Sequence, residues 1–132
     1  MELSDDTILA IRLVKSVMLR QGTDSDEIAA IASVIQNRCT AKKKSAFDII
    51  CEQGQFKGHG NNIRESEVED KELYKEAVEL AKKLVNGEKI PDTSNGAYFF
   101  TRVCGDFMYQ DWAKDKLASA GQVGGLYLYK WI

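Results

Sequence analysis

The sequence lacks the features that mark several specialised classes of protein. Its 18 basic and 20 acidic residues give a net charge of −2, without the positive excess typical of nucleic-acid-binding proteins or of polybasic membrane-surface segments. The first twenty residues include the acids Glu2, Asp5 and Asp6 and no uninterrupted apolar run. We therefore expect no signal peptide and no transmembrane helix, so that the chain is cytoplasmic when synthesised and any export needs another route.

Residues that bind metals or form redox centres are also scarce. The three cysteines, Cys39, Cys51 and Cys104, are odd in number, and their spacing matches neither a zinc site nor a redox motif. The single histidine, His59, lies between two glycines, without a nucleophile motif and without metal-binding partners at helical spacing. We expect reduced, partly buried thiols, a solvated loop histidine, and no metal or cofactor.

The strongest pattern that is present is a helix in the stretch TDSDEIAAIASVIQNR, residues 23–38. Asp24 is a good N-cap, and Glu27 three residues later predicts a capping box that satisfies backbone donors. Asn37 and Arg38 are expected to end the helix, with a cation near the negative end of its dipole. The apolar residues between them cover more than one helical face. We therefore expect the buried central helix of one domain spanning residues 1–132.

Other helices are predicted around the central one by caps, apolar spacing and glycine stops. The first is capped by Ser4 or Asp5 and interrupted at Gln21 and Gly22. The second runs from its cap, Ser45, through Cys51. The third starts among residues 65–70, runs to Asn86 and is stopped by Gly87. The stretch EQGQFKGHGNN between the second and third of these predicts an irregular surface loop.

Short strands are predicted in the last third of the chain. The only proline, Pro91, opens the turn-forming cluster PDTSNG, and the aromatic-rich residues 97–100 follow as a strand. The final run LYLYKWI, with Tyr127 and Tyr129 on one side, is predicted to pair with it as a small β-hairpin. A short helix over residues 112–117 and glycine-rich loops are expected between them. Together these elements predict a mainly α (α+β) fold.

Several short motifs then occur in a fixed order: IRLVKSVMLRQG, VIQNR, GQF, NGEKIPDTSNGAYFF, DWA and GGLYLY. In this order they resemble the spore-cortex-lytic type of cell-wall hydrolase family over about residues 10–129. The matching positions are Asn37, Arg38, Gln55, Phe56, Asp92, Asn95, Gly96, Ala97, Tyr98, Trp112 and Tyr129. The resemblance implies a lysozyme-like fold with a groove for peptidoglycan glycan strands, cleaved between N-acetylmuramic acid and N-acetylglucosamine by a muramidase or lytic transglycosylase.

The chain departs from that family at the position of the catalytic glutamate. Aligned without a gap from Asn37, this position holds Leu19; with the preceding turn lengthened by two residues, it holds Val17. An aliphatic side chain cannot deliver the proton that the leaving glycosidic oxygen requires. Because general acid catalysis is typically worth about 100- to 10,000-fold, we expect a pseudoenzyme with weakened or lost catalysis. The exception would be a substitute acid, for which Glu27 and Glu52 are the candidates.

The resemblance also implies which residues bind the glycan. Gln55, Phe56, Asn95 and Tyr98 are predicted to line one concave surface, with amide groups and aromatic faces suited to N-acetylated sugars. The alternative is that Phe56 and Tyr98 belong to the core, since aromatic residues in short loops and strands are commonly buried.

Two functions remain open from the sequence. The first is a peptidoglycan-directed domain related to bacteriolytic enzymes, with its catalytic step weakened, lost or moved to another acid. The second is a structural or assembly component of a phage virion or contractile injection machine that retains the hydrolase fold. The lack of a predicted signal peptide suits a virion-borne protein that acts at the cell wall. The expected partner is the peptidoglycan glycan strand or, in the second case, a phage or injection-machine protein, with neither nucleic acid nor membrane.

Overall fold

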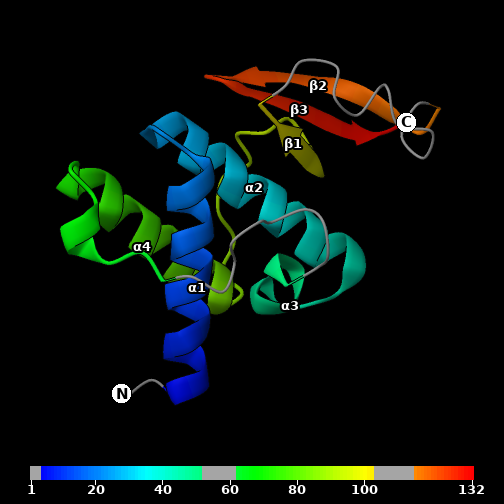
Figure 1. Ribbon diagram of the computed structural model, residues 1–132. Helices are drawn as coiled ribbons and strands as arrows, with labels where there is room; N and C mark the ends of the chain where they lie inside the picture. Colours follow the sequence, from blue (N-terminus) through cyan, green and yellow to red (C-terminus); the bar gives the residue numbers. More distant parts are fainter. Residues whose placement is uncertain (1–3, 52–61, 103–114) are drawn as a thin grey trace.

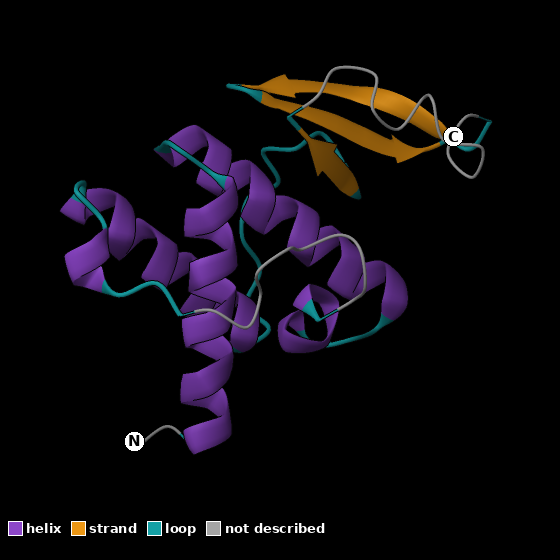
Figure 2. Ribbon diagram, in the orientation of Figure 1, coloured by secondary structure: helices purple, strands orange, loops and turns teal. Residues whose placement is uncertain are grey.

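The computed structural model describes residues 4–51, 62–102 and 115–132. Within these ranges the elements are α1 (Asp5–Gln21), α2 (Ser25–Lys42), α3 (Ala46–Ile50), the short 3-10 helix η1 (Glu65–Glu67), α4 (Lys71–Val85), β1 (Phe99–Thr101), β2 (Leu117–Val123) and β3 (Leu126–Trp131). The helices form one group, and the three strands form a small sheet at one side of it (Figures 1 and 2). The predicted mainly helical α+β class is confirmed.

The helices begin where the sequence predicts because a side chain satisfies free backbone donors at each start. Ser4 Oγ accepts a hydrogen bond from Thr7 N at 3.2 Å at the start of α1. Asp24 Oδ1 accepts one from the backbone N of Glu27 at 2.9 Å at the start of α2. Asp70 and Ser45 cap α4 and α3 in the same way. The N-terminal boundaries of the helices are therefore encoded locally.

The predicted end of the central helix at Arg38 is wrong, because α2 continues for another turn to Lys42. The helix ends at Lys43, whose φ of 54° places it in the left-handed region that terminates helices. Arg38 instead lies inside the fold, where its Nη1 donates to the Tyr98 carbonyl at 3.2 Å and its guanidinium lies 5.1 Å from the centre of the Phe99 ring. A basic residue near a helix end favours that end but does not stop the helix.

The interior is organised around α2, as the sequence predicts. This helix contacts α1, α3, α4, β1 and β2. Its apolar side chains are fully buried, among them Ile28, Ile31, Val34 and Ile35. Helix α4 packs chiefly against α1 and contributes Ala77, Ala81 and Leu84 to the same core. The helical group and the inner face of the sheet therefore share one apolar core.

The sheet differs from the predicted hairpin in one respect. Strand β1 pairs antiparallel with β3, with Phe99 opposite Tyr129, as predicted. A further strand, β2, covers residues 117–123, where the end of a short helix and loops were expected, and the tight hairpin is the β2–β3 pair. Residues 117–123 are rich in Ala, Ser and Gly, which have weak strand propensity, so pairing with β3 and not local preference makes this strand.

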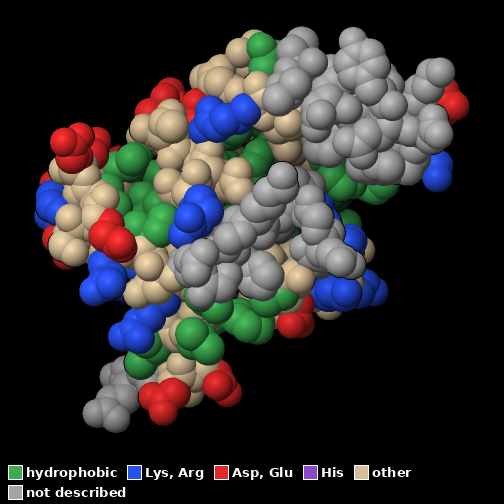
Figure 3. Space-filling model, in the orientation of Figure 1, with side chains coloured by type: hydrophobic (Ala, Val, Ile, Leu, Met, Phe, Trp, Pro, Cys, Tyr) green, Lys and Arg blue, Asp and Glu red, His purple; other side chains and the backbone are tan. Residues whose placement is uncertain are grey.

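Charged side chains are spread over the surface. Figure 3 shows acidic and basic groups interspersed on the described part of one face, without a broad area of a single sign. Within the described ranges, no helix combines the length and the apolar character needed to cross a membrane.

Candidate functional site

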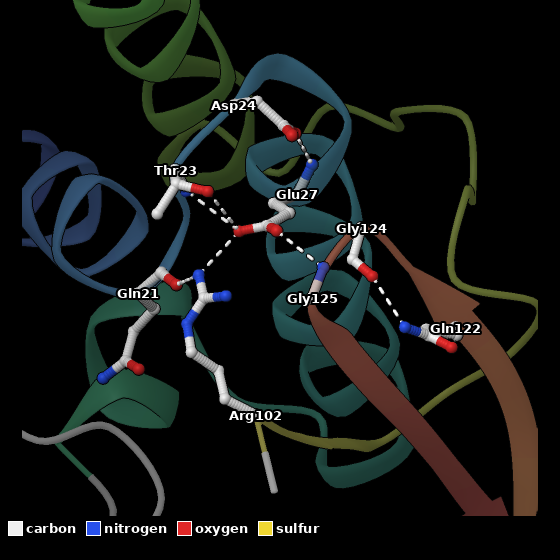
Figure 4. A network of polar contacts seen from close by, with 8 residues as sticks. All are labelled: Gln21, Thr23, Asp24, Glu27, Arg102, Gln122, Gly124 and Gly125. Atoms are coloured by element: carbon white, nitrogen blue, oxygen red, sulfur yellow. Dashed lines mark hydrogen bonds and ion pairs between the residues drawn. The ribbon is translucent and has the colours of Figure 1, made fainter. Parts of the chain in front are cut away.

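Glu27 lies in the first turn of α2, and its side chain leaves the helix to join two other segments. Its Oε1 accepts hydrogen bonds from Thr23 N at 2.9 Å and Thr23 Oγ1 at 3.0 Å, in the turn between α1 and α2. Its Oε2 accepts one from the Gly125 N of the β2–β3 turn at 2.8 Å (Figure 4). The predicted capping box is thus only half formed, because Asp24 caps the helix while Glu27 reaches Thr23 and Gly125.

Arg102 completes this network from the residue that follows β1. Its Nη2 lies 2.6 Å from Glu27 Oε1 and also donates to the Gln21 carbonyl at the end of α1. The Glu27 side chain is 4% exposed, whereas that of Arg102 is 42% exposed. The pair therefore joins the end of α1, the start of α2, the end of β1 and the β2–β3 turn, with its acid inside and its base at the surface (Figure 4). Arg102 was not predicted from the sequence, because a lone arginine after a short strand carries no local signal.

The network fixes the protonation state of Glu27. Burial of the carboxyl raises its pKa, but the hydrogen bonds from Arg102, Gly125 and Thr23 lower it by more, and the pKa falls from 4.5 to about 2. At neutral pH this carboxylate therefore carries no proton, and all of its nearby donors hold it ionised. Such surroundings disfavour the predicted role of Glu27 as a substitute general acid, for which a raised pKa is required.

Two glycines make the close approach to Glu27 possible. Gly124 has a φ of +56°, and a Cβ placed on it would lie 2.6 Å from Glu27 Oε2. A Cβ on Gly125 would lie 2.9 Å from Arg102 Nη1 and 3.5 Å from Glu27 Oε2. The GG pair in the GGLYLY motif is thus explained by contact with a carboxylate and a guanidinium that are distant in sequence.

The two positions considered for the family glutamate lie close together on α1 but differ in exposure. Val17 is fully buried in the core, whereas Leu19 is half-buried and packs at the edge of the core. Leu19 stands two residues before Gln21, whose carbonyl binds Arg102. Of the two positions, only 19 leaves part of its side chain accessible to a ligand.

A second polar network holds the PDTSNG turn against α2. Asn37 Nδ2 donates to the Ala97 carbonyl at 2.9 Å and lies 3.3 Å from both Asp92 Oδ2 and Ser94 Oγ. Burial raises the pKa of Asp92, but hydrogen bonds from Ser94, Asn37 and the Gly96 backbone lower it by more, so the net shift is downward. Asn37 and Asp92, which match the family motifs, therefore have a structural role, because they join α2 to the PDTSNG turn.

The predicted glycan-binding residues are only partly described. Gln55, Phe56 and the candidate acid Glu52 lie outside the described residues, as does His59. Tyr98 is half-buried and lines a surface hollow of about 470 Å³ between the C-terminal ends of α2 and α4. Asn95 has a φ of 56° and donates from Nδ2 to the Ala120 carbonyl of β2 at 3.2 Å, outside the lining of that hollow. The single concave surface containing all four residues remains a prediction.

Among the described residues, no group of three or more His, Cys, Asp or Glu side chains is placed to hold a metal ion. What the described geometry offers is a buried, ionised carboxylate, a partly exposed guanidinium and a half-buried aliphatic residue at the end of α1.

The fold and these networks define a mainly helical domain whose small sheet is joined by polar contacts to the starts and ends of its helices. Residues 22–127 match the family described as Cell Wall Hydrolase, and the chain belongs to this family. Its function is accordingly related to the hydrolysis of peptidoglycan. Neither the curated proteins nor the solved structures include a match to the chain. Because the family match begins at Gly22, it includes Glu27 but neither of the positions 17 and 19.

Proposed function

We propose that this chain is a peptidoglycan-binding domain of the spore-cortex-lytic type in which the glycan-cleaving step is weakened or lost. The proposal is carried by the absence of a protonated acid at both candidate positions. Leu19, at the family glutamate position, is aliphatic, and the candidate acid Glu27 is held ionised. A general acid must hold a proton near neutral pH and release it to the leaving sugar oxygen, and neither side chain does so.

The accessible position 19 favours the ungapped alignment of the chain with the family. A glutamate at position 17 would replace a fully buried valine and place an unpaired carboxylate in the core. A glutamate at position 19 would replace a half-buried leucine at the helix end, where its carboxyl has access to solvent and to a bound ligand.

The test is to restore the acid and to look for cleavage. We expect the unmodified chain to release no soluble glycan from purified peptidoglycan sacculi, and Leu19→Glu to release it. Leu19→Gln is the matched control, because it has similar size and polarity but no acid, and it should remain inactive. Cleavage by the unmodified chain would overturn the proposal, and its loss in Glu27→Gln or Glu52→Gln, in a variant that circular dichroism shows to be folded, would identify the substitute acid.

Binding to sacculi separates the two functions left open by the sequence. A sedimentation assay should find the unmodified chain bound to sacculi without release of fragments, and Leu19→Gln should bind equally well. Failure to bind would contradict a peptidoglycan-directed role and would favour a structural component of a virion or injection machine.

A further inference from the structure

The described partners of Arg102 use only one of its three guanidinium nitrogens. Its hydrogen bonds to described residues are both made by one nitrogen, Nη2, which donates to the Gln21 carbonyl and to Glu27 Oε1. The guanidinium has five N–H donors, so the two on Nη1 and the one on Nε remain. Within the described residues these three make no hydrogen bond, and 42% of the side chain is exposed.

The guanidinium that carries the remaining donors is held in place on a partly exposed side chain. Because Nη2 is bound to two oxygens, the guanidinium plane is fixed before a ligand arrives. Binding a ligand therefore costs little further side-chain entropy. Nη1 points toward the β2–β3 turn (Figure 4), where the absence of a side chain on Gly125 lets the turn pass close to the guanidinium without displacing it. A Cβ on Gly125 would lie 2.9 Å from Arg102 Nη1, too close for the guanidinium to keep its position.

The charge of Arg102 is only partly balanced by Glu27. The carboxylate shares its charge with three further donors, the Thr23 N, the Thr23 Oγ1 and the Gly125 N. Its contact with the guanidinium is through a single nitrogen and not through a bidentate pair. The neighbouring acid Asp24 lies on the other side of Glu27 from Arg102 (Figure 4). A second anionic group can therefore approach the free side of the guanidinium.

We propose that Arg102, through the guanidinium donors that Glu27 and Gln21 do not use, forms a carboxylate-binding subsite that recognises the muramyl residues of a glycan strand. This inference rests on the proposed function. Along such a strand the N-acetylglucosamine units are neutral, and carboxylates occur on the lactyl group of muramic acid or on the peptide attached to it. The subsite lies at Gln21, two residues from Leu19, so it would set which sugar of the strand stands at the end of α1.

The experiment compares neutral with anionic sugars by calorimetric or NMR titration. The probes are chitotetraose, the disaccharide N-acetylglucosaminyl-N-acetylmuramic acid with a free lactyl carboxylate, and the same disaccharide carrying a tripeptide. Arg102→Gln should weaken binding of an anionic probe about 10-fold or more and change chitotetraose binding less than about 2-fold. If Arg102→Gln weakens binding of the disaccharide without peptide, Arg102 binds the lactyl carboxylate. If it weakens binding only of the disaccharide with the tripeptide, Arg102 binds a carboxylate of the peptide.

Two further variants separate recognition from folding. Arg12→Gln makes the same substitution at an exposed position on α1 and should leave the binding of all probes unchanged. Gly125→Ala keeps the arginine but adds a Cβ 2.9 Å from Nη1, which should displace the guanidinium, so it should also weaken only the anionic probes. Equal losses for neutral and anionic sugars, or no loss in either variant, would overturn the subsite. If the unmodified chain binds the anionic probes without any dependence on Arg102, only the subsite fails; if it binds no probe and no sacculi, both proposals fail.

Discussion

Four hydrogen-bond donors converge on the carboxylate of Glu27, and all of them favour its ionised form. A carboxylate whose pKa is lower in the folded than in the unfolded chain stabilises the fold above the unfolded pKa. This stability is lost as the pH falls through the folded pKa. For Glu27 the window therefore runs from about pH 4.5 down to about pH 2.

We predict that Glu27→Gln lowers the free energy of unfolding at pH 7 by about 3 kcal/mol, which is the order expected for the lowered pKa of a buried acid. The difference from the unmodified chain should shrink as the pH falls from 4.5 toward 2, because protonation then removes the same charge from the native side chain. Urea unfolding at a series of pH values measures it. Asp26→Asn is the control, because it neutralises an exposed acid in the same turn of α2. A difference that stays constant over this range would contradict the ion-pair account.

Among the elements, the β2–β3 turn is joined to α2 by contacts that leave no room for side chains. Gly124 needs its glycine for two reasons, a positive φ and the nearness of Glu27. Gly87, after α4, also has a positive φ, of 75°, but no neighbouring atom lies within 4 Å of where a Cβ would be. At Gly87 only the backbone conformation therefore favours glycine.

The two glycines make a matched comparison. Gly87→Ala should lower the free energy of unfolding by about 1 kcal/mol, the usual cost of a left-handed conformation for a residue with a Cβ. Gly124→Ala should cost about 1–3 kcal/mol more, because the Cβ displaces a carboxylate that is held by Arg102 and Thr23. Chemical denaturation measures both. Combining Gly124→Ala with Glu27→Ala should remove the additional cost, and equal costs for the two single variants would show that the turn does not press on Glu27.

In the molecule as a whole, α2 is the element on which the helices and the sheet converge. Its apolar residues face helices on several sides and the sheet on another, so a charge placed among them has no solvated position. An unpaired buried charge costs several kcal/mol, against a total stability of about 5–15 kcal/mol for a domain of this kind.

We therefore predict that Ala32→Asp abolishes cooperative thermal unfolding, as followed by circular dichroism. Ala41→Asp places the same substitution on an exposed position of the same helix and should cost less than about 1 kcal/mol. Ile31→Asp is expected to behave like Ala32→Asp, since both native residues are fully buried. If Ala32→Asp melts like the unmodified chain, α2 is not the centre of the core.

The helices could be predicted from the amino-acid sequence alone, because their signals are local. Ser4, Asp24 and Asp70 cap helices whose apolar spacing matches a 3.6-residue period, and Gly87 ends α4. The ordered motifs also indicated the cell wall hydrolase family, which the match over residues 22–127 confirms. Each of these features depends on residues that are near one another in the chain or on their order along it.

The roles of the polar residues became clear only from the folded arrangement. Glu27 meets Arg102 and Gly125 across separations of 75 and 98 residues, so its local capping pattern could not reveal that it is held ionised. Strand β2 forms from residues of weak strand propensity because β3 supplies its partner. Val17 and Leu19 look alike in sequence but differ in burial, since exposure depends on what packs against each side chain. The physical reason is the same in each case: long-range contacts set the protonation, pairing and exposure of a residue, and a local pattern does not contain them.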